Sequence, residues 1–405
     1  MPIVEIGRVW LKSISIEGIF FCLGIFFKQF YFFPSGSLGL GDCCFGISAL
    51  ILLWKRIYRK QGIGLEKKDW FLYGFLSCII IINGMYWFLI KHPDSIKHTI
   101  YWIYAIMIVW SFRQLGSRNI LVQALMKTLK ISILFQTVVW SFGWGRIYYE
   151  YWGATRYMGT FNNPNQMAYI IFLMLLLLYF YELDKKKFWL FGIMAGMLIA
   201  ATKSTGVFLG WCTLAFSDIL IAFYRLSKQK KIYRKFWYLF WCVFLIGIPL
   251  GLWFIWPNPE FLIEETDYSL IARLQEKIYK VWTGGLTGLI YDRGWERMIL
   301  YPKYLLFGAG EGNELRFPLT VWQSEIHSTF FSILFCYGLI PFLLFCKWLF
   351  DNLKTCFINY WAVYIALFLE CITVINYRQP FFWMVVLAGS LLGIREKKYE
   401  KREKV

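Results

Sequence analysis

The chain has 405 residues, of which 59% are hydrophobic and 21% aromatic, and its formal net charge is +18. The apolar share exceeds the roughly one half that is usual in soluble globular domains, which excludes an ordinary soluble globule. The basic residues stand mainly in short segments between long apolar runs, so the charge indicates orientation in a membrane and not nucleic-acid binding.

About twelve apolar runs are long enough to cross a bilayer as helices, since roughly 17 to 25 residues suffice, and strand-type alternation is absent. The sequence therefore predicts an all-α polytopic membrane protein, with residues 1–405 forming a single integral-membrane domain. The expected spans are 13–33, 38–54, 70–90, 99–112, 119–143, a sixth beginning at Pro164, 188–202, an eighth returning to the basic loop at 227–235, 236–256, 325–346, 357–375 and 381–393.

Clusters of lysine and arginine set the orientation of these spans. They occupy the loops at 55–68, 185–187 and 227–235 and the tail at 395–405. The positive-inside rule places such loops, and with them both termini, in the cytoplasm. The one long loop, 257–323, is then expected on the periplasmic side and to contain short interfacial helices.

The loop before the sixth span contains the first candidate binding site. Arg156 precedes a Gly-Thr-Phe-Asn-Asn-Pro-Asn motif that ends at Asn165, in which Asn163 as N-cap and Pro164 at the first helical position predict a helix start. An arginine beside the free amides of a helix N-terminus suits an anion, although capping alone also explains the motif. Lys203 ends a short span on the same side, where it can reach water or contact a substrate phosphate.

The long loop contains a second predicted helix, with Asp292 as N-cap and its end before Pro302. This helix would place Arg293 and Arg297 one turn apart on the same face. Two guanidinium groups so placed suit a diphosphate, because each can form bidentate hydrogen bonds to phosphate oxygens. Pairing of Arg293 with Glu296 along the helix is the structural alternative.

Three other features of this loop have plainer explanations. Residues 268–282 show the periodicity of an amphipathic helix lying on the bilayer surface. Gly308 and Gly310 form a Gly-x-Gly turn that can simply reverse the chain. Arg316 adds an outer cation, for which a solvated loop position is the alternative to substrate binding.

The tenth span begins with a Ser-Glu-Ile-His sequence. Ser324 is the expected N-cap, which places Glu325 and His327 in the first helical turn. A helix N-terminus disfavours the protonated form of a histidine, and a neutral imidazole can act as a general base. Packing or hydrogen bonding is the alternative role for His327.

All of these candidates, from Arg156 to His327, fall on one side of the predicted membrane. Charged residues with unrelated structural roles would not all be expected on the same side of the membrane. Their common location therefore favours a single extracytoplasmic site for an anionic, lipid-linked substrate. The ten cysteines show no metal-binding spacing, and no metal or other cofactor is predicted.

Residues 150–345 resemble the O-antigen ligase and polymerase superfamily, in particular the Wzy-type O-antigen polymerases of O-antigen and capsule repeat units. The resemblance rests on Arg156 with residues 159–165, and on the segments 203–205, 292–297, 307–312, 325–328 and 337–338.

The resemblance implies a metal-independent integral-membrane glycosyltransferase of lipopolysaccharide or capsule polysaccharide biosynthesis. Such an enzyme transfers an undecaprenyl-diphosphate-linked oligosaccharide onto the non-reducing end of another lipid-linked repeat unit, at the outer face of the bacterial inner membrane. By position, Arg156, Arg293 and Arg297 would hold the diphosphate and His327 would assist deprotonation of the acceptor hydroxyl. The two glycines of the turn would let the loop approach the substrate, and a flippase and a chain-length regulator are the implied partners.

Two positions depart from the family pattern. The usual Ser-Arg is Ser204-Thr205 here, with Lys203 as the substitute cation, and the common His-Asn is His327-Ser328. The sister ligase, which transfers the glycan to lipid A core or protein, remains an alternative. A lipid-linked oligosaccharide flippase and a metal-dependent glycosyltransferase are further alternatives, although the first outer loop offers only Asp42 as a carboxylate.

Overall fold

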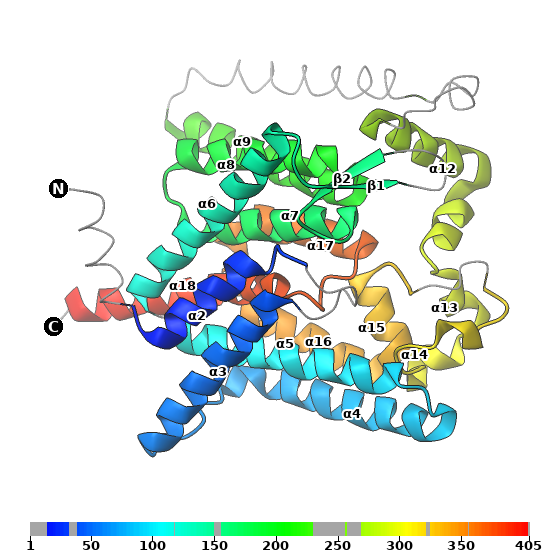
Figure 1. The fold of residues 1–405 in the computed structure, drawn as a ribbon, viewed down its shortest axis with the longest axis horizontal. Helices are drawn as coiled ribbons and strands as arrows, with labels where there is room; N and C mark the ends of the chain where they lie inside the picture. The colour runs from blue at the N-terminus through cyan, green and yellow to red at the C-terminus, as the bar shows by residue number, and fades with distance from the viewer. Residues whose placement is uncertain are drawn as a thin grey trace.

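A computed structural model describes residues 14–31, 39–116, 118–149, 155–229, 256, 269–320, 325–354 and 356–403. The described chain is mainly helical (Figure 1). Its α-helices are α2 (Ile16–Phe27), α3 (Leu40–Tyr58), α4 (Trp70–Ile90), α5 (Asp94–Gly116), α6 (Asn119–Ser141), α7 (Pro164–Tyr181), α8 (Lys185–Ala201), α9 (Thr205–Gln229), α12 (Leu270–Asp292), α13 (Glu296–Leu300), α14 (Lys303–Phe307), α15 (Thr329–Tyr337), α16 (Leu339–Leu353), α17 (Phe357–Thr373) and α18 (Pro380–Glu403).

Several predicted spans are found where hydropathy placed them. Helix α4 has the bounds expected for the third span, and α7 begins at Pro164, with the Asn163 side chain accepting a hydrogen bond from the Asn165 amide at 2.8 Å. Four described helices are long and apolar enough to cross a membrane: Lys67–Ile90, Asn119–Ser141, Pro164–Tyr181 and Thr205–Arg225. The ninth span, 236–256, lies outside the described residues except for Trp256, and the count of twelve stays a prediction.

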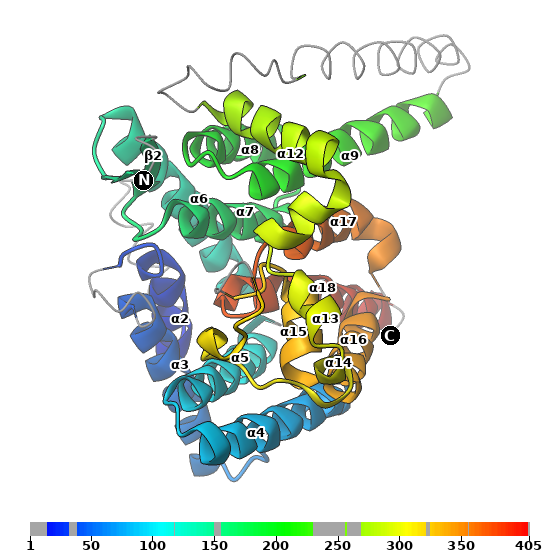
Figure 2. The ribbon, with the colours of Figure 1, turned by 90° about the vertical axis from the view of Figure 1, so that its right-hand side faces the viewer.

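Helices α7 and α18 form the centre of the molecule. Every residue of α7 except Asn165 and Tyr169 is buried. Helices α6, α8, α9, α17 and α18 all contact α7. In Figures 1 and 2 the helices succeed one another in layers, from α8 and α9 through α7 and α18 to α5 and finally α4.

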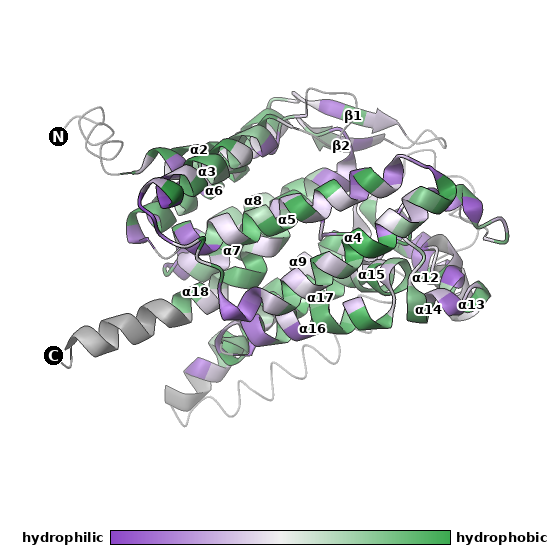
Figure 3. Ribbon diagram, turned by 90° about the horizontal axis from the view of Figure 1, so that it is seen from below, coloured by the Kyte–Doolittle hydropathy of each residue, from purple (hydrophilic) through white to green (hydrophobic). Residues whose placement is uncertain are grey.

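Apolar side chains cover much of the outside of this bundle. Leu50, Trp54, Phe88 and Leu89 are each about two thirds to three quarters exposed. Figure 3 shows hydrophobic residues along the helices and hydrophilic ones on the β-hairpin and near helix ends. Such exposed apolar surface is unusual in water and is what a membrane helix presents to lipid.

One loop of this mainly helical protein contains a short β-hairpin that the sequence did not predict. Strands β1 (Arg146–Tyr149) and β2 (Thr155–Gly159) form an antiparallel hairpin where the sequence predicted a loop before the sixth span. The two strands contain Tyr148, Tyr149 and Tyr157, and tyrosine favours strands, but each strand is too short for this preference to stand out in the sequence.

The tenth span is broken into two helices, contrary to prediction. Helix α15 ends at Tyr337 and α16 begins at Leu339, because Gly338 adopts φ +81° and ψ 179°. Only glycine readily adopts this backbone conformation. Hydropathy does not reveal the break, since the residues on both sides of it are apolar.

The second predicted loop helix is also placed differently. Asp292 is the last residue of α12 and not an N-cap, and the next helix, α13, begins only at Glu296. Gly294, at φ +68°, turns the chain between them. Helix α12 covers most of the helix predicted over 268–282 and then breaks at Gly285 (φ +58°, ψ −156°) before it continues to Asp292.

Replacing Gly338 by alanine should destabilise the fold. A Cβ at this position would lie 2.5 Å from the Leu306 carbonyl oxygen, in a conformation that alanine avoids. We expect a loss of at least about 2 kcal/mol and a clear fall in Tm of the purified protein in detergent. Gly84→Ala is the matched control, because its Cβ would meet no atom within 4 Å; an equal fall in both variants would contradict the argument.

Candidate functional site

Several helix ends converge around a cavity of about 790 Å³. Its lining includes residues from the C-terminal ends of α2, α8 and α17 and from the N-terminal ends of α3, α5, α7, α9 and α18. In the topology predicted from the basic loops, all of these ends lie on one side of the membrane. The structure thus brings together segments that are up to about 350 residues apart in the sequence.

The cavity is electropositive. It is lined by eight lysines and arginines but only four aspartates and glutamates. Asp42 is paired with Lys28 at 2.7 Å, and Glu325 with Arg378 at 2.8 Å. Burial and the neighbouring Glu325 raise the pKa of Glu314. The basic residues are Lys28, Lys97, Arg156, Lys203, Arg273, Lys277, Arg293 and Arg378.

Arg156 joins three elements at one wall. It lies on β2, is 5% exposed, and donates from Nε to the Thr202 carbonyl at 2.7 Å and from a terminal nitrogen to Asn165 Oδ1 at 2.6 Å. These bonds fix the guanidinium between the end of α8 and the start of α7. Asn163, Asn165 and Lys203 line the cavity beside it, so the structure brings these four predicted residues together.

Arg293 and His327 are neighbours at another part of the wall. The His327 amide donates to the Arg293 carbonyl at 2.9 Å, and the Arg293 guanidinium donates to the Thr373 carbonyl at 2.9 Å. Both side chains line the cavity. Burial and the positive charge of Arg293 lower the pKa of His327 below its ordinary 6.5, with partial opposition from Glu325. The imidazole is therefore neutral at neutral pH and can accept a proton.

The helix start near His327 differs from the prediction. The N-cap is Ser328, whose hydroxyl accepts a hydrogen bond from the Phe331 amide at 3.4 Å, and Ser324 lies outside the described residues. His327 thus precedes the helix and is not in its first turn. Burial is the largest cause of its lowered pKa, followed by the charge of Arg293.

Arg297 does not share a face with Arg293. It is 2% exposed, and its guanidinium carbon lies 5.4 Å from the centre of the Phe317 ring. Arg293 lines the large cavity, whereas Arg297 is not among the described residues that line it. The prediction that the two residues lie one turn apart on the same helix face is wrong, because the turn at Gly294 separates them.

Gly308, Gly310 and Arg316 belong to the framework beside the cavity. A Cβ on Gly308 would lie 2.7 Å from the Tyr337 backbone, and the Gly310 amide donates to the Cys336 carbonyl at 2.7 Å. Arg316 donates to the Gly310 carbonyl at 2.8 Å. None of the three predicted binding residues is among the described lining residues of the large cavity. Gly308 lies against the helix break at Gly338.

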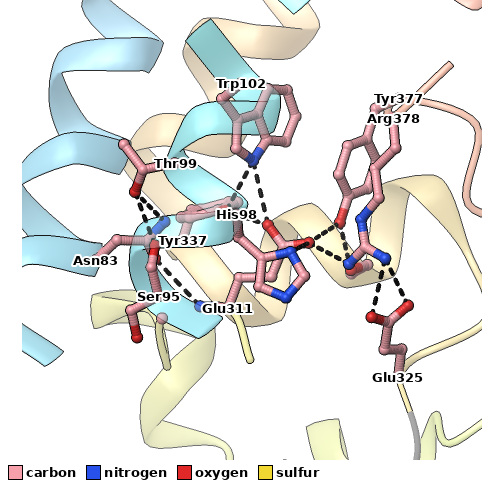
Figure 4. A network of polar contacts seen from close by, with 12 residues as sticks. Asn83, Ser95, His98, Thr99, Trp102, Glu311, Glu325, Tyr337, Tyr377 and Arg378 are labelled. Atoms are coloured by element: carbon pink, nitrogen blue, oxygen red, sulfur yellow. Dashed lines mark hydrogen bonds and ion pairs between the residues drawn. The ribbon is translucent and has the colours of Figure 1, made fainter. Parts of the chain in front are cut away.

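Sequence reasoning missed a buried polar network centred on Glu311 (Figure 4). The carboxylate, 2% exposed, accepts hydrogen bonds from Tyr377 at 2.7 Å, from Trp102 at 3.2 Å and from Tyr337 and Arg378. Burial alone would raise the pKa of Glu311, but the charges of His98, 3.3 Å away, and Arg378 lower it to about 2. His98 and Arg378 also line the cavity.

Arg378, a cation in the outer loop before the last predicted span, is a sequence signal that could have pointed to this network. Its partners lie more than fifty residues away in the sequence.

Among the described residues, no group of three or more histidine, cysteine, aspartate or glutamate side chains could hold a metal ion. Comparison with models of known protein families and with curated proteins finds no match. Fold and site therefore define a mainly helical protein with an electropositive cavity where helix ends meet.

Removing the Glu311 carboxylate should be strongly destabilising. Glu311→Ala leaves buried donors and the charge of Arg378 without their common partner, so we expect a loss of about 3–5 kcal/mol in the free energy of unfolding. Glu276→Ala is the control, since it removes only a helix-surface pair with Lys280 at 2.9 Å and should cost at most about 1 kcal/mol. Thermal and denaturant unfolding in detergent measures both. Similar stabilities would show that the network does not hold the fold.

Proposed function

We propose that the protein is a repeat-unit polymerase of O-antigen or capsule polysaccharide. It transfers an undecaprenyl-diphosphate-linked oligosaccharide to another lipid-linked unit. The observation that carries the proposal is the electropositive cavity of about 790 Å³ with Arg293 and neutral His327 side by side in its wall. This volume falls in the range of sites that enclose small ligands and suits a diphosphate with its attached sugars.

The basic wall supplies the diphosphate site. Arg156, Lys203, Arg273, Lys277 and Arg293 come from four separate segments and all line the cavity. Arginine is suited to phosphate because its planar group forms paired hydrogen bonds, while lysine contributes a compact charge. Donors already in place where negative charge develops lower the barrier to departure of the diphosphate.

In the proposed reaction a hydroxyl oxygen of the acceptor sugar attacks the anomeric carbon of the donor sugar. A new carbon–oxygen bond forms while the bond from that carbon to the diphosphate oxygen breaks. The hydroxyl proton passes to the neutral imidazole of His327, and the electron pair of the broken bond leaves with undecaprenyl diphosphate beside Arg293. General-base assistance of this kind contributes about 10²–10⁴-fold to a rate.

The proposal includes an inner-membrane location with both termini in the cytoplasm and the cavity open to the periplasm. Its support is the convergence of alternate helix ends at the cavity, together with the basic loops at the opposite ends of the same helices. A flippase that delivers the lipid-linked unit and a chain-length regulator would be its partners.

The decisive test is incubation of the purified protein with one synthetic undecaprenyl-diphosphate-linked repeat unit. A ladder of products on the lipid carrier would support the polymerase. Transfer of the glycan only to lipid A core or protein would identify a ligase, and passage across vesicles with unchanged glycan length would identify a flippase.

Arg293→Ala should abolish the ladder or slow it by more than about 100-fold, because a donor to the departing diphosphate is lost. Arg293→Lys keeps the charge without the forked geometry and should retain intermediate activity. Arg59→Ala, at an exposed position away from the cavity, is the control and should be active. Full activity of Arg293→Ala would refute the assignment.

His327→Ala should lower the rate by about 10²–10⁴-fold, whereas His92→Ala, which removes a histidine outside the cavity lining, should not. In the wild type kcat/KM should fall as pH is lowered through a midpoint below 6.5, since the base acts only when neutral and the pKa of His327 is lowered. The residual activity of His327→Ala should lack this acid limb. An unchanged pH profile in the variant would exclude His327 as the base.

A further inference from the structure

Three of the four acidic side chains that line the cavity have a partner within the described chain. The three pairs are Asp42 with Lys28 at 2.7 Å, Glu325 with Arg378 at 2.8 Å and Asp94 with His92 at 3.3 Å. The fourth is Glu314, whose carboxyl group forms no hydrogen bond or ion pair with any other described residue. Its oxygens are therefore available to a ligand.

The carboxyl group of Glu314 is open to the cavity. The residue lines the cavity and is only partly buried. Neither of its oxygens is among the described side-chain atoms that are fully enclosed and lack a hydrogen-bond partner. Because both oxygens lack a partner, both must retain accessible surface. A ligand in the cavity can therefore reach them.

An unusual backbone conformation presents Glu314 at this position. Gly312 has φ +92° and Asn313 has φ +53°, and asparagine is one of the few residues besides glycine that are often found at such angles. The short helical turn that begins at Glu314 follows directly. This turn separates Glu314 at the cavity wall from Glu311 in the buried network.

Glu314 and His327 lie in the same electrostatic environment. Burial raises the pKa of Glu314 and lowers that of His327. The charge of Glu325 raises the pKa of both groups and the charge of Arg297 lowers both, so the two side chains lie near the same two charges. Both also line the same cavity. A sugar held by Glu314 would therefore be close to the base.

We propose that the Glu314 carboxyl group binds hydroxyls of the acceptor sugar and positions the attacking hydroxyl at His327. The inference rests on the proposed function and adds the class of acceptor, which is a neutral sugar with two adjacent hydroxyls. The two carboxylate oxygens can accept one hydrogen bond from each hydroxyl, and the protonated form can both donate and accept. An acidic sugar here would place a further negative charge beside Glu314, which disfavours its binding.

This role separates the two substrates of the proposed reaction. The cationic wall that includes Arg156 and Arg293 suits the diphosphate of the donor. A carboxyl group is a poor ligand for phosphate, because like charges repel. Glu314 therefore fits the uncharged end of the acceptor and not the leaving group.

The test uses the purified full-length protein in nanodiscs and two substrates, each of which can play only one part. Both carry a disaccharide of neutral hexoses on an undecaprenyl carrier. In the donor the accepting hydroxyl is methylated, so it cannot accept. In the acceptor a carbon replaces the oxygen between the anomeric carbon and phosphorus, so it cannot donate. The kcat and the KM of each substrate are then measured separately.

Glu314→Ala should raise the KM of the acceptor at least about tenfold, since hydrogen bonds to a charged group are lost, and change the KM of the donor by less than about twofold. Glu314→Gln keeps one oxygen acceptor and the shape of the side chain, so it should restore part of the acceptor affinity. Glu276→Ala, outside the cavity lining, is the control and should leave both KM values unchanged. Tm is measured for each variant, and Glu314→Gln carries the test if the alanine variant does not fold.

The outcomes separate the two proposals. An unchanged acceptor KM, or an equal rise of both KM values, would overturn the role of Glu314 while the polymerase proposal stands. A fall in kcat with both KM values unchanged would assign Glu314 to the chemical step and also overturn the positioning role. A wild type that forms no product would overturn the proposed function, and the role of Glu314 with it.

Discussion

The structure depends on how the charge of Glu311 is neutralised. An ionised carboxylate that is 2% exposed is tolerated only when hydrogen bonds and opposite charges surround it. Trp102 on α5, Tyr337 at the end of α15 and the Tyr377–Arg378 segment before α18 supply these bonds. Since these elements are far apart in sequence, the carboxylate fixes their relative positions, and with them the cavity that they border.

Glu311 can reach this position because two glycine backbones meet. Gly308 and Gly338 approach so closely that a Cβ on either would lie within 2.8 Å of the other segment's backbone. The break at Gly338 leaves carbonyl groups at the end of α15, and the amides of Ala309 and Gly310 donate to two of them, those of Phe335 and Cys336. The Gly-Ala-Gly-Glu sequence therefore completes a broken helix, which places the glutamate after it in the core.

The sequence could predict what local patterns determine. Hydropathy placed α4, and capping chemistry placed the start of α7 at Pro164. The distribution of basic residues predicted that four candidates lie on the same side of the membrane: Arg156, Lys203, Arg293 and His327. The structure brings all four together at one cavity.

Features that depend on one backbone angle or on distant contacts could not be predicted. The turn at Gly294 moved Arg297 away from Arg293, although helical spacing alone favoured a pair. Arg378 meets Glu325 and Glu311 only after folding.

In the proposed reaction the placement of Arg293 next to His327 couples substrate binding to base strength. With the cavity empty, the arginine charge helps to hold the imidazole in its neutral form. A bound diphosphate would offset that positive charge, and the proton affinity of His327 would then rise. The imidazole would thus become a stronger base when the leaving group is in place, and it would gain its positive charge as the diphosphate gains negative charge. One pair of neighbouring side chains can in this way link recognition of the donor to activation of the acceptor.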